Sequence, residues 1–227
     1  MSIKIFKIYG IQRTRSNYLQ KFMEINYKNV IVLSNLSGWK HGFVQTNPDW
    51  TGSNWEETQE NSKQFFTKNL EESKGYEIKI KKAFKNNQIN FLFCFRNPYD
   101  NFLSMFKHAK DKDTFHIWFV DNWNKKNKNY LDFIENSNNT HLFKFESFPD
   151  DTKEVFDNLK LKFSLETKNK NYQNVENTVN PRLTMGREKF VYSKFDESQF
   201  IDKDLKKYFE NNLDLETMNK LNYRILK

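Results

Sequence analysis

Residues 3–22 read IKIFKIYGIQRTRSNYLQKF, and this stretch decides how the rest of the sequence is interpreted. Its first seven residues form an apolar run interrupted by two lysines, a pattern that predicts a buried β-strand. Gly10 follows, and the apolar residues of 16–27 then recur at helical spacing. Free N–H groups and the dipole at a helix start favour an anion, so the stretch predicts either a phosphate-binding loop or a capped helix with surface arginines.

Three further apolar runs, at 30–34, 89–95 and 141–145, predict more strands. Helical spacing is found at 54–73, 76–85, 100–110 and 114–134, after Pro149 and from Asp202 onward, whereas 166–181 is polar and aperiodic and predicts a loop. Strands that alternate with helices imply βαβ units and a parallel sheet. We therefore expect one α/β domain over residues 1–227, a parallel β-sheet flanked by helices, with functional residues just after the strands.

The composition favours an anionic partner. Lys and Arg total 37 against 29 Asp and Glu, a formal net charge of +8, although a lysine-rich solvated surface gives the same balance without a partner. Aromatic residues make up 17% of the chain, including 23 Phe, which predicts a core of Phe and Ile. The single cysteine, Cys94, excludes an intramolecular disulfide and a cysteine-rich metal site, and we expect a buried, inert thiol.

The N-terminal residues are too charged for a signal peptide, and no apolar run approaches the length of a membrane span. The default expectation is a soluble, cytoplasmic protein without membrane insertion. The sequence carries no signal of oligomeric state.

A second motif follows the third predicted strand, where residues 91–108 read FLFCFRNPYDNFLSMFKH. Arg96 lies at the strand end, Pro98 ends strand pairing, and Asp100 is expected to begin a helix that carries Ser104. An arginine fork and a serine hydroxyl at this spacing can converge on one phosphate group. The alternative is an arginine that caps the sheet edge and an ordinary helix serine.

Together, RTRSNYL at 13–19 and RNPYDNFLS at 96–104 resemble the two nucleotide-binding signatures of the PAPS-dependent sulfotransferases, PAPS being 3′-phosphoadenosine 5′-phosphosulfate. The family's first signature, Arg/Lys-Ser-Gly-Thr-Asn/Thr-Trp/Tyr-Leu, cradles the 5′-phosphosulfate. The Arg and Ser of its second signature, Arg-Asp/Asn-Pro-x-Asp-x3-Ser, hold the 3′-phosphate. THLFKFESF at 140–148 is similar to the family's strand that leads to a Tyr/Phe-Glu pair, and LDLETMNKLNY at 213–223 is similar to its closing helix.

The resemblance covers nearly the whole chain, most strongly in the two motifs, and implies the P-loop-NTPase-like sulfotransferase fold. The residues expected to bind the co-substrate are Arg13, Thr14, Arg15, Ser16, Asn17, Tyr18, Arg96, Ser104 and Arg187. Arg15 departs from the family pattern because a glycine usually stands there; either the loop is reshaped or Arg15 adds a phosphate contact. Arg187 follows Gly186 in a stretch similar to the family's basic loop over the 3′-phosphate and adenine, and Arg182 is the alternative.

GWKHGF at 38–43 follows the second predicted strand, near the place where the family carries a basic Lys-x-His or Lys-His element. The resemblance makes His41 the candidate general base, with Lys40 and Arg13 stabilising charge on the sulfonate and the leaving phosphate. A histidine suits this role because it titrates near neutral pH. The alternatives are a structural role for His41, His108 as the base, or a remote Glu24; His116 and His141 are expected to be structural.

The expected function is transfer of a sulfuryl group from PAPS to a hydroxyl or amine of a small-molecule or carbohydrate acceptor, without a metal and without a nucleic-acid partner. Segments 43–75 and 166–181 are expected to shape the acceptor pocket. One alternative is a P-loop kinase, but its Gly-x4-Gly-Lys-Ser/Thr loop is absent and no Mg²⁺-binding carboxylate is evident. The other alternative is a non-enzymatic polyanion-binding protein, suggested by the positive charge and the aromatic residues.

Overall fold

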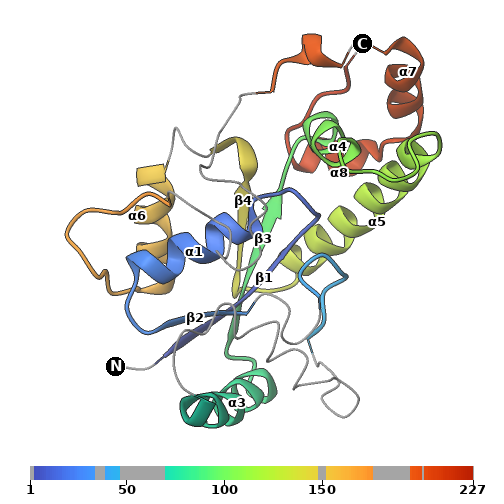
Figure 1. Cartoon of the computed structure of the whole chain (residues 1–227). Helices are drawn as coiled ribbons and strands as arrows, with labels where there is room; N and C mark the ends of the chain where they lie inside the picture. Colours follow the sequence, from blue (N-terminus) through green and yellow to red (C-terminus); the bar gives the residue numbers. More distant parts are fainter. Residues whose placement is uncertain are drawn as a thin grey trace.

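A parallel sheet forms the centre of the protein (Figure 1). The structure is a computed structural model, and it describes residues 3–33, 39–46, 70–147, 152–175, 195–200 and 202–226. Its strands are β1 (Lys4–Gly10), β2 (Val30–Leu33), β3 (Ile89–Phe95) and β4 (Thr140–Lys144). They lie in the order β2-β1-β3-β4, and every neighbouring pair is parallel. The α/β class with a parallel sheet is therefore confirmed.

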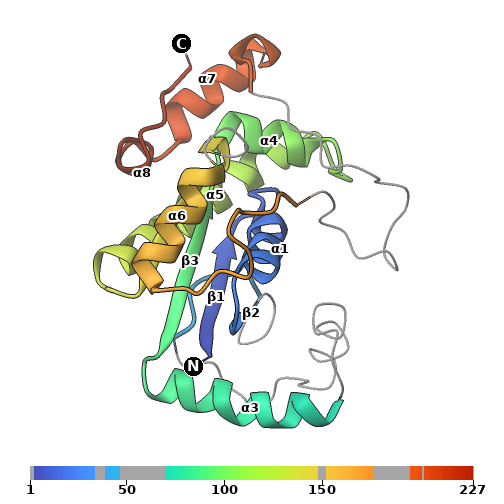
Figure 2. The same cartoon turned by 90° about the vertical axis from the view of Figure 1, so that its left-hand side faces the viewer.

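Helices cover both faces of this sheet. One face packs against α1 (Ser16–Asn26) and α6 (Thr152–Phe163), and the other packs against α5 (Phe115–Glu135). Helix α3 (Leu70–Lys85) lies across the amino ends of the strands, whereas α4 (Pro98–Phe106), α7 (Lys203–Asn212) and α8 (Leu215–Lys220) gather beyond the carboxyl ends (Figures 1 and 2). Strands β1 and β3 are mainly apolar on both faces, with Lys7 and Asn90 as exceptions inside them, because both strands are central and buried on two sides.

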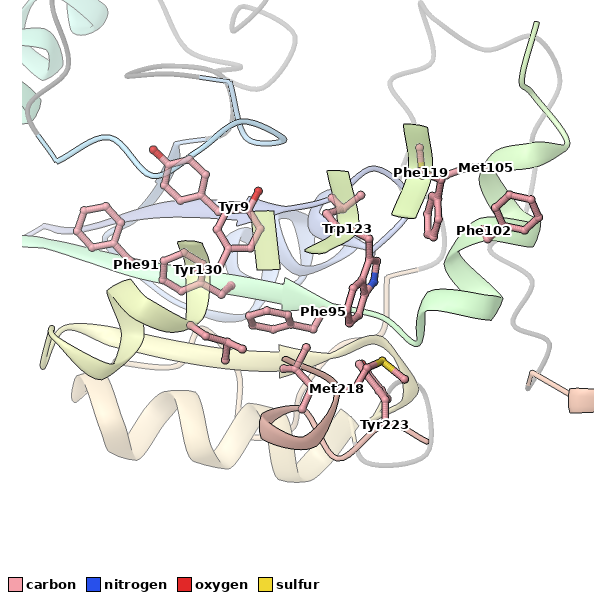
Figure 3. Close-up of a cluster of buried hydrophobic side chains, with 14 of the residues drawn as sticks. Tyr9, Phe91, Phe95, Phe102, Met105, Phe119, Trp123, Tyr130, Met218 and Tyr223 are labelled. Carbon is pink, nitrogen blue, oxygen red and sulfur yellow. The ribbon is translucent and has the colours of Figure 1, made fainter. Parts of the chain in front are cut away.

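The larger of the two core clusters is strongly aromatic, as the composition predicts (Figure 3). Alternate residues of β3 point to opposite faces, so Phe91, Phe93 and Phe95 join this cluster with Tyr130 of α5. Cys94 points to the other face, where its thiol is free and buried. The predicted buried thiol is confirmed.

Most predicted boundaries differ from the observed ones by one or two residues. The strand predicted at 89–95 is confirmed, and the predictions at 3–9 and 141–145 are each displaced by one residue. The prediction that Asp100 begins a helix is wrong: α4 begins at Pro98, because the side chain of Asn97 accepts a hydrogen bond from the Tyr99 N–H at 3.0 Å and proline suits the first helical position.

Two other helix predictions need correction. Helix α3 runs without a break through residues 73–76, where the sequence predicted the end of one helix and the start of another. The predicted tail helix is two helices, because Leu213 ends α7 and the Asp214 side chain then caps α8 by accepting from the Thr217 N–H at 2.8 Å. The rest of the predicted helix at 54–73, before Leu70, lies outside the described residues.

Candidate active site

The two sequence motifs meet at the carboxyl ends of β1 and β3. These strands are neighbours, and Gly10 at the end of β1 is paired with Cys94 of β3. The chain then leaves β1 for α1 on one face, and it leaves β3 for α4 and then for α5 on the other face. Open α/β sheets bind ligands at such a point, outside the carboxyl ends of adjacent strands whose connections diverge, and we call this part of the molecule the crevice.

The loop after β1 is folded tightly against β3. A Cβ atom at Gly10 would lie 2.5 Å from Thr14 Oγ1 and 2.8 Å from the carbonyl oxygen of Cys94, so only glycine fits there. The Thr14 hydroxyl donates to the carbonyl of Ile11 at 2.7 Å and closes the turn. The Thr14 side chain therefore shapes the loop.

Two arginines of this loop have left-handed backbones, with φ of 68° at Arg13 and 64° at Arg15. A left-handed non-glycine residue costs roughly 1–2 kcal/mol. At Arg15, the chain thus keeps the backbone conformation for which glycine is normally chosen and adds a buried guanidinium. The side chain of Arg13, in contrast, is exposed.

The start of α1 suits an anion. Arg15 occupies the N-cap position without a side-chain cap, and the first turn of α1 has no acidic residue. The first N–H groups of any helix lack intrahelical acceptors, and here the positive end of the dipole is not neutralised by a neighbouring carboxylate in that turn. Ser16 is buried in this first turn, whereas the ring of Tyr18 packs in the core at 6.1 Å from that of Phe22.

Arg96 connects the two motifs. Its buried guanidinium makes a two-pronged ion pair with Asp100, Nε to Oδ2 at 2.7 Å and Nη2 to Oδ1 at 2.8 Å. Its Nη1 donates to the carbonyl of Arg13 at 2.8 Å. The side-chain partner of Arg96 in this structure is Asp100, four residues along the chain. Ser104 lies one further turn along α4 and is half-buried.

Lys40 reaches the same crevice from the turn after β2. Its buried ammonium donates a hydrogen bond to Asn17 Oδ1 in the first turn of α1, and its carbonyl accepts from the Gly10 N–H at 2.9 Å. Burial lowers the pKa of Lys40 to about 8. The predicted grouping of Lys40 with the loop after β1 is therefore present in the structure.

The His41 ring is hydrogen-bonded to the backbone through one of its two nitrogens. Its Nδ1 lies 2.6 Å from the carbonyl oxygen of Gly10. Because a carbonyl only accepts, Nδ1 carries the proton and Nε2 is the unprotonated nitrogen. Burial, with smaller contributions from nearby Lys40, Lys126 and Lys7, lowers the pKa of His41 to about 4. The ring is therefore neutral at pH 7, the state that a general base requires.

Residues 39–46 are held by contacts that the sequence did not reveal. The Tyr130 hydroxyl of α5 donates to the Gly42 carbonyl at 2.8 Å, and Asn129 Oδ1 accepts from the Val44 N–H at 2.9 Å. The Gln45 N–H donates to the Tyr9 hydroxyl of β1 at 3.0 Å. The turn that carries Lys40 and His41 is thus fastened to both the sheet and α5.

Two exposed aromatic residues flank His41 in sequence, and neither was predicted to have a function. Trp39 is 51% exposed and Phe43 is 52% exposed. The Trp39 ring meets the His41 ring edge-on, with the centroids 5.2 Å apart.

Lys7 was also missed by the sequence-based prediction of site residues. It is fully buried in β1, and burial keeps its pKa well below the usual range. A lysine inside an apolar strand was the signal that could have identified it.

The remaining candidates lie elsewhere or are not described. His108 is exposed, the His116 ring packs edge-on against Tyr208, and the His141 ring packs against Phe143. Glu24 is partly buried, and its carboxylate accepts from Gln20 at 3.0 Å. Arg182 and Arg187 lie outside the described residues.

The described ranges contain neither a clustered set of metal ligands nor a helix that could span a membrane. No group of three or more His, Cys, Asp or Glu residues in these ranges is arranged to hold a metal ion. No helix there combines the length and apolar character needed to cross a membrane.

Comparisons with known proteins give structural neighbours. No protein-family model matches the sequence, and no curated protein matches it. The structure is similar to the sulfotransferase domain from the curacin biosynthetic pathway, with 12% identity, a TM-score of 0.48, and coverage of 100% of this chain and 99% of that chain. It is also similar to the sulfotransferase domain from the Synechococcus PCC 7002 olefin synthase, with 14% identity, a TM-score of 0.47, and coverage of 100% and 96%.

The Arg96–Asp100 pair yields a stability prediction. Arg96→Met leaves a buried carboxylate unpaired and should lower the free energy of unfolding by about 3–5 kcal/mol, whereas adding Asp100→Asn should recover much of this loss. Urea unfolding of the single and double variants measures the coupling. The matched control is the exposed pair Lys125–Asp121 on α5, also four residues apart, where the same substitutions should cost under about 1 kcal/mol. Additive losses at Arg96 and Asp100 would contradict the ion pair.

Proposed function

We propose that this protein is a PAPS-dependent sulfotransferase that moves a sulfuryl group to a hydroxyl or amine of a small-molecule or carbohydrate acceptor. The observation that supports this most strongly is the junction between the two motifs. Arg96, which opens the second motif, donates to the carbonyl of Arg13, which opens the first. Two segments whose residue types match the two phosphate-binding signatures of the family therefore lie side by side.

The residues fit a compound with two separated phosphate groups. At one end are the N–H groups of the first turn of α1, together with Arg13 and Arg15; at the other end are Arg96 and Ser104. Asp100 and the Arg13 carbonyl engage three of the five N–H groups that a guanidinium carries. Within the described ranges no further acceptor of Arg96 is found, so two of its N–H groups remain for a phosphate oxygen. In this assignment Arg96 and Ser104 bind the 3′-phosphate and the loop binds the 5′-phosphosulfate.

The chemistry follows from the side chains around His41. PAPS supplies an activated sulfuryl group, and the reaction is an in-line displacement at sulfur. Nε2 of His41 takes the proton as the acceptor oxygen or nitrogen bonds to sulfur, and the bond from sulfur to the bridging phosphate oxygen breaks. Lys40 and Arg13 stabilise the negative charge on the sulfonate and on the departing phosphate. The products are the sulfated acceptor and 3′-phosphoadenosine 5′-phosphate (PAP).

Isothermal titration calorimetry with the product nucleotide tests the proposal. We expect PAP to bind with a dissociation constant in the micromolar range, and ATP with Mg²⁺ to bind much more weakly. Binding of ATP–Mg²⁺ without binding of PAP would contradict the proposal in favour of a kinase. Binding of heparin with a steep salt dependence, but not of PAP, would favour a polyanion-binding protein.

A second prediction concerns catalysis by His41. An acceptor is first identified by screening small alcohols and carbohydrates with ³⁵S-labelled PAPS. His41→Ala should then lower turnover by roughly 10²-fold or more, with PAP affinity nearly unchanged, whereas His108→Ala should turn over normally. Because the pKa of His41 is about 4, wild-type turnover should hold at pH 6.5 and fall only as the pH approaches 4. Retained turnover in His41→Ala would place the base elsewhere.

A further inference from the structure

The two buried arginines of the crevice share one aromatic ring. Phe145 opens the short 3₁₀ helix η1 (Phe145–Ser147), directly after β4. The guanidinium carbon of Arg96 lies 3.8 Å from the centroid of its ring, and that of Arg15 lies 3.9 Å from it. Two guanidinium groups this close cannot occupy one face without overlap, so they lie on opposite faces. Phe145 therefore separates and contacts both cations.

All three side chains are buried. Arg15 and Arg96 are each 8% exposed, and Phe145 is 9% exposed. Cation–π contacts are strongest where water is excluded, and each is worth about 0.5–2 kcal/mol. The stack is thus a stabilising contact that fixes where the two guanidinium groups lie relative to each other.

A stacked guanidinium keeps its hydrogen-bonding edge. Contact with the ring uses the flat face of the cation, whereas its N–H groups point outward in its plane. Arg96 is consistent with this, because its N–H groups bind Asp100 and the Arg13 carbonyl while its guanidinium carbon lies 3.8 Å from the centroid of the Phe145 ring. The ring therefore orients the arginines without consuming the donors that an anion needs.

The neighbouring residue ties η1 to the second motif. The Glu146 carboxylate accepts a hydrogen bond from the Asn97 N–H at 2.7 Å and another from the Tyr223 hydroxyl at 3.1 Å. Phe145 and Glu146 thus hold the segment at 96–97 from two sides. Burial raises the pKa of Glu146 above its usual range.

We propose that Phe145 is a positioning residue that holds Arg15 and Arg96 on its two faces, so that one guanidinium serves each phosphate subsite of the crevice. In this arrangement Arg15, which replaces the usual loop glycine, is an added ligand of the 5′-phosphate, and its placement depends on Phe145. The inference rests on the proposed function for the identity of the bound compound. The orientation of the two arginines by the ring does not depend on the proposed function.

The test compares three variants by PAP calorimetry. Phe145→Leu removes the ring and should raise the PAP dissociation constant about 10-fold or more, as expected for the loss of two cation–π contacts. Phe145→Tyr keeps the ring and should bind PAP within about 3-fold of wild type. The matched control is Phe143→Leu, since Phe143 is a buried phenylalanine two residues earlier, on β4, in the core cluster that packs against α1 and α6. That control should also bind PAP within about 3-fold of wild type, even with a lowered Tm.

The outcomes separate this inference from the proposed function. If wild type binds PAP and Phe145→Leu binds it as well as Phe143→Leu does, the positioning role is wrong and the proposed function stands. If wild type does not bind PAP, the proposed function is wrong, and inorganic pyrophosphate then serves as the probe of the arginine pair in a thermal-shift assay. Stabilisation of wild type and Phe143→Leu by pyrophosphate, but not of Phe145→Leu, supports the positioning role. The absence of that difference overturns it.

Discussion

The buried guanidinium of Arg96 is the contact on which the crevice depends. It pairs with Asp100 on α4, binds the carbonyl of Arg13 after β1, and stacks on Phe145 after β4. A buried charge without these partners would cost several kcal/mol, so the three segments are stable only when they are assembled together. A single side chain at the end of β3 thereby joins the loops that follow three neighbouring strands of the sheet.

Burial has opposite consequences for the charged and the neutral groups of the crevice. The arginines keep their protons even when they are buried, so they remain cationic. An anion that enters the crevice therefore meets fixed positive charge. His41, by contrast, becomes neutral because burial and the neighbouring lysines lower its pKa to about 4. A cationic binding region and an unprotonated imidazole therefore lie next to each other at neutral pH, a combination that suits attack on a negatively charged group.

The sequence predicted the strands and the position of the two motifs because these depend on local pattern and on the geometry of parallel sheets. Mainly apolar runs marked β1 and β3, and their carboxyl ends did bring Gly10 and Arg96 to one edge. The start of α4 was missed because the Asn97 cap determines it. The two-sided contact of the arginines with Phe145 and the burial of Lys7 were also missed, since each depends on tertiary packing between distant segments. The pairing of Arg96 with Asp100 was missed although the two residues are only four positions apart.

The central claim is that the motifs after β1 and β3 bind two phosphate groups of one nucleotide. The most direct measurement is the ratio of the calorimetric dissociation constants for PAP and for 5′-AMP, which lacks the 3′-phosphate. Because charge-assisted hydrogen bonds from Arg96 and Ser104 contribute about 1.5–3 kcal/mol each, the account predicts that PAP binds roughly 100-fold more tightly or better. Equal affinities for the two nucleotides would contradict it.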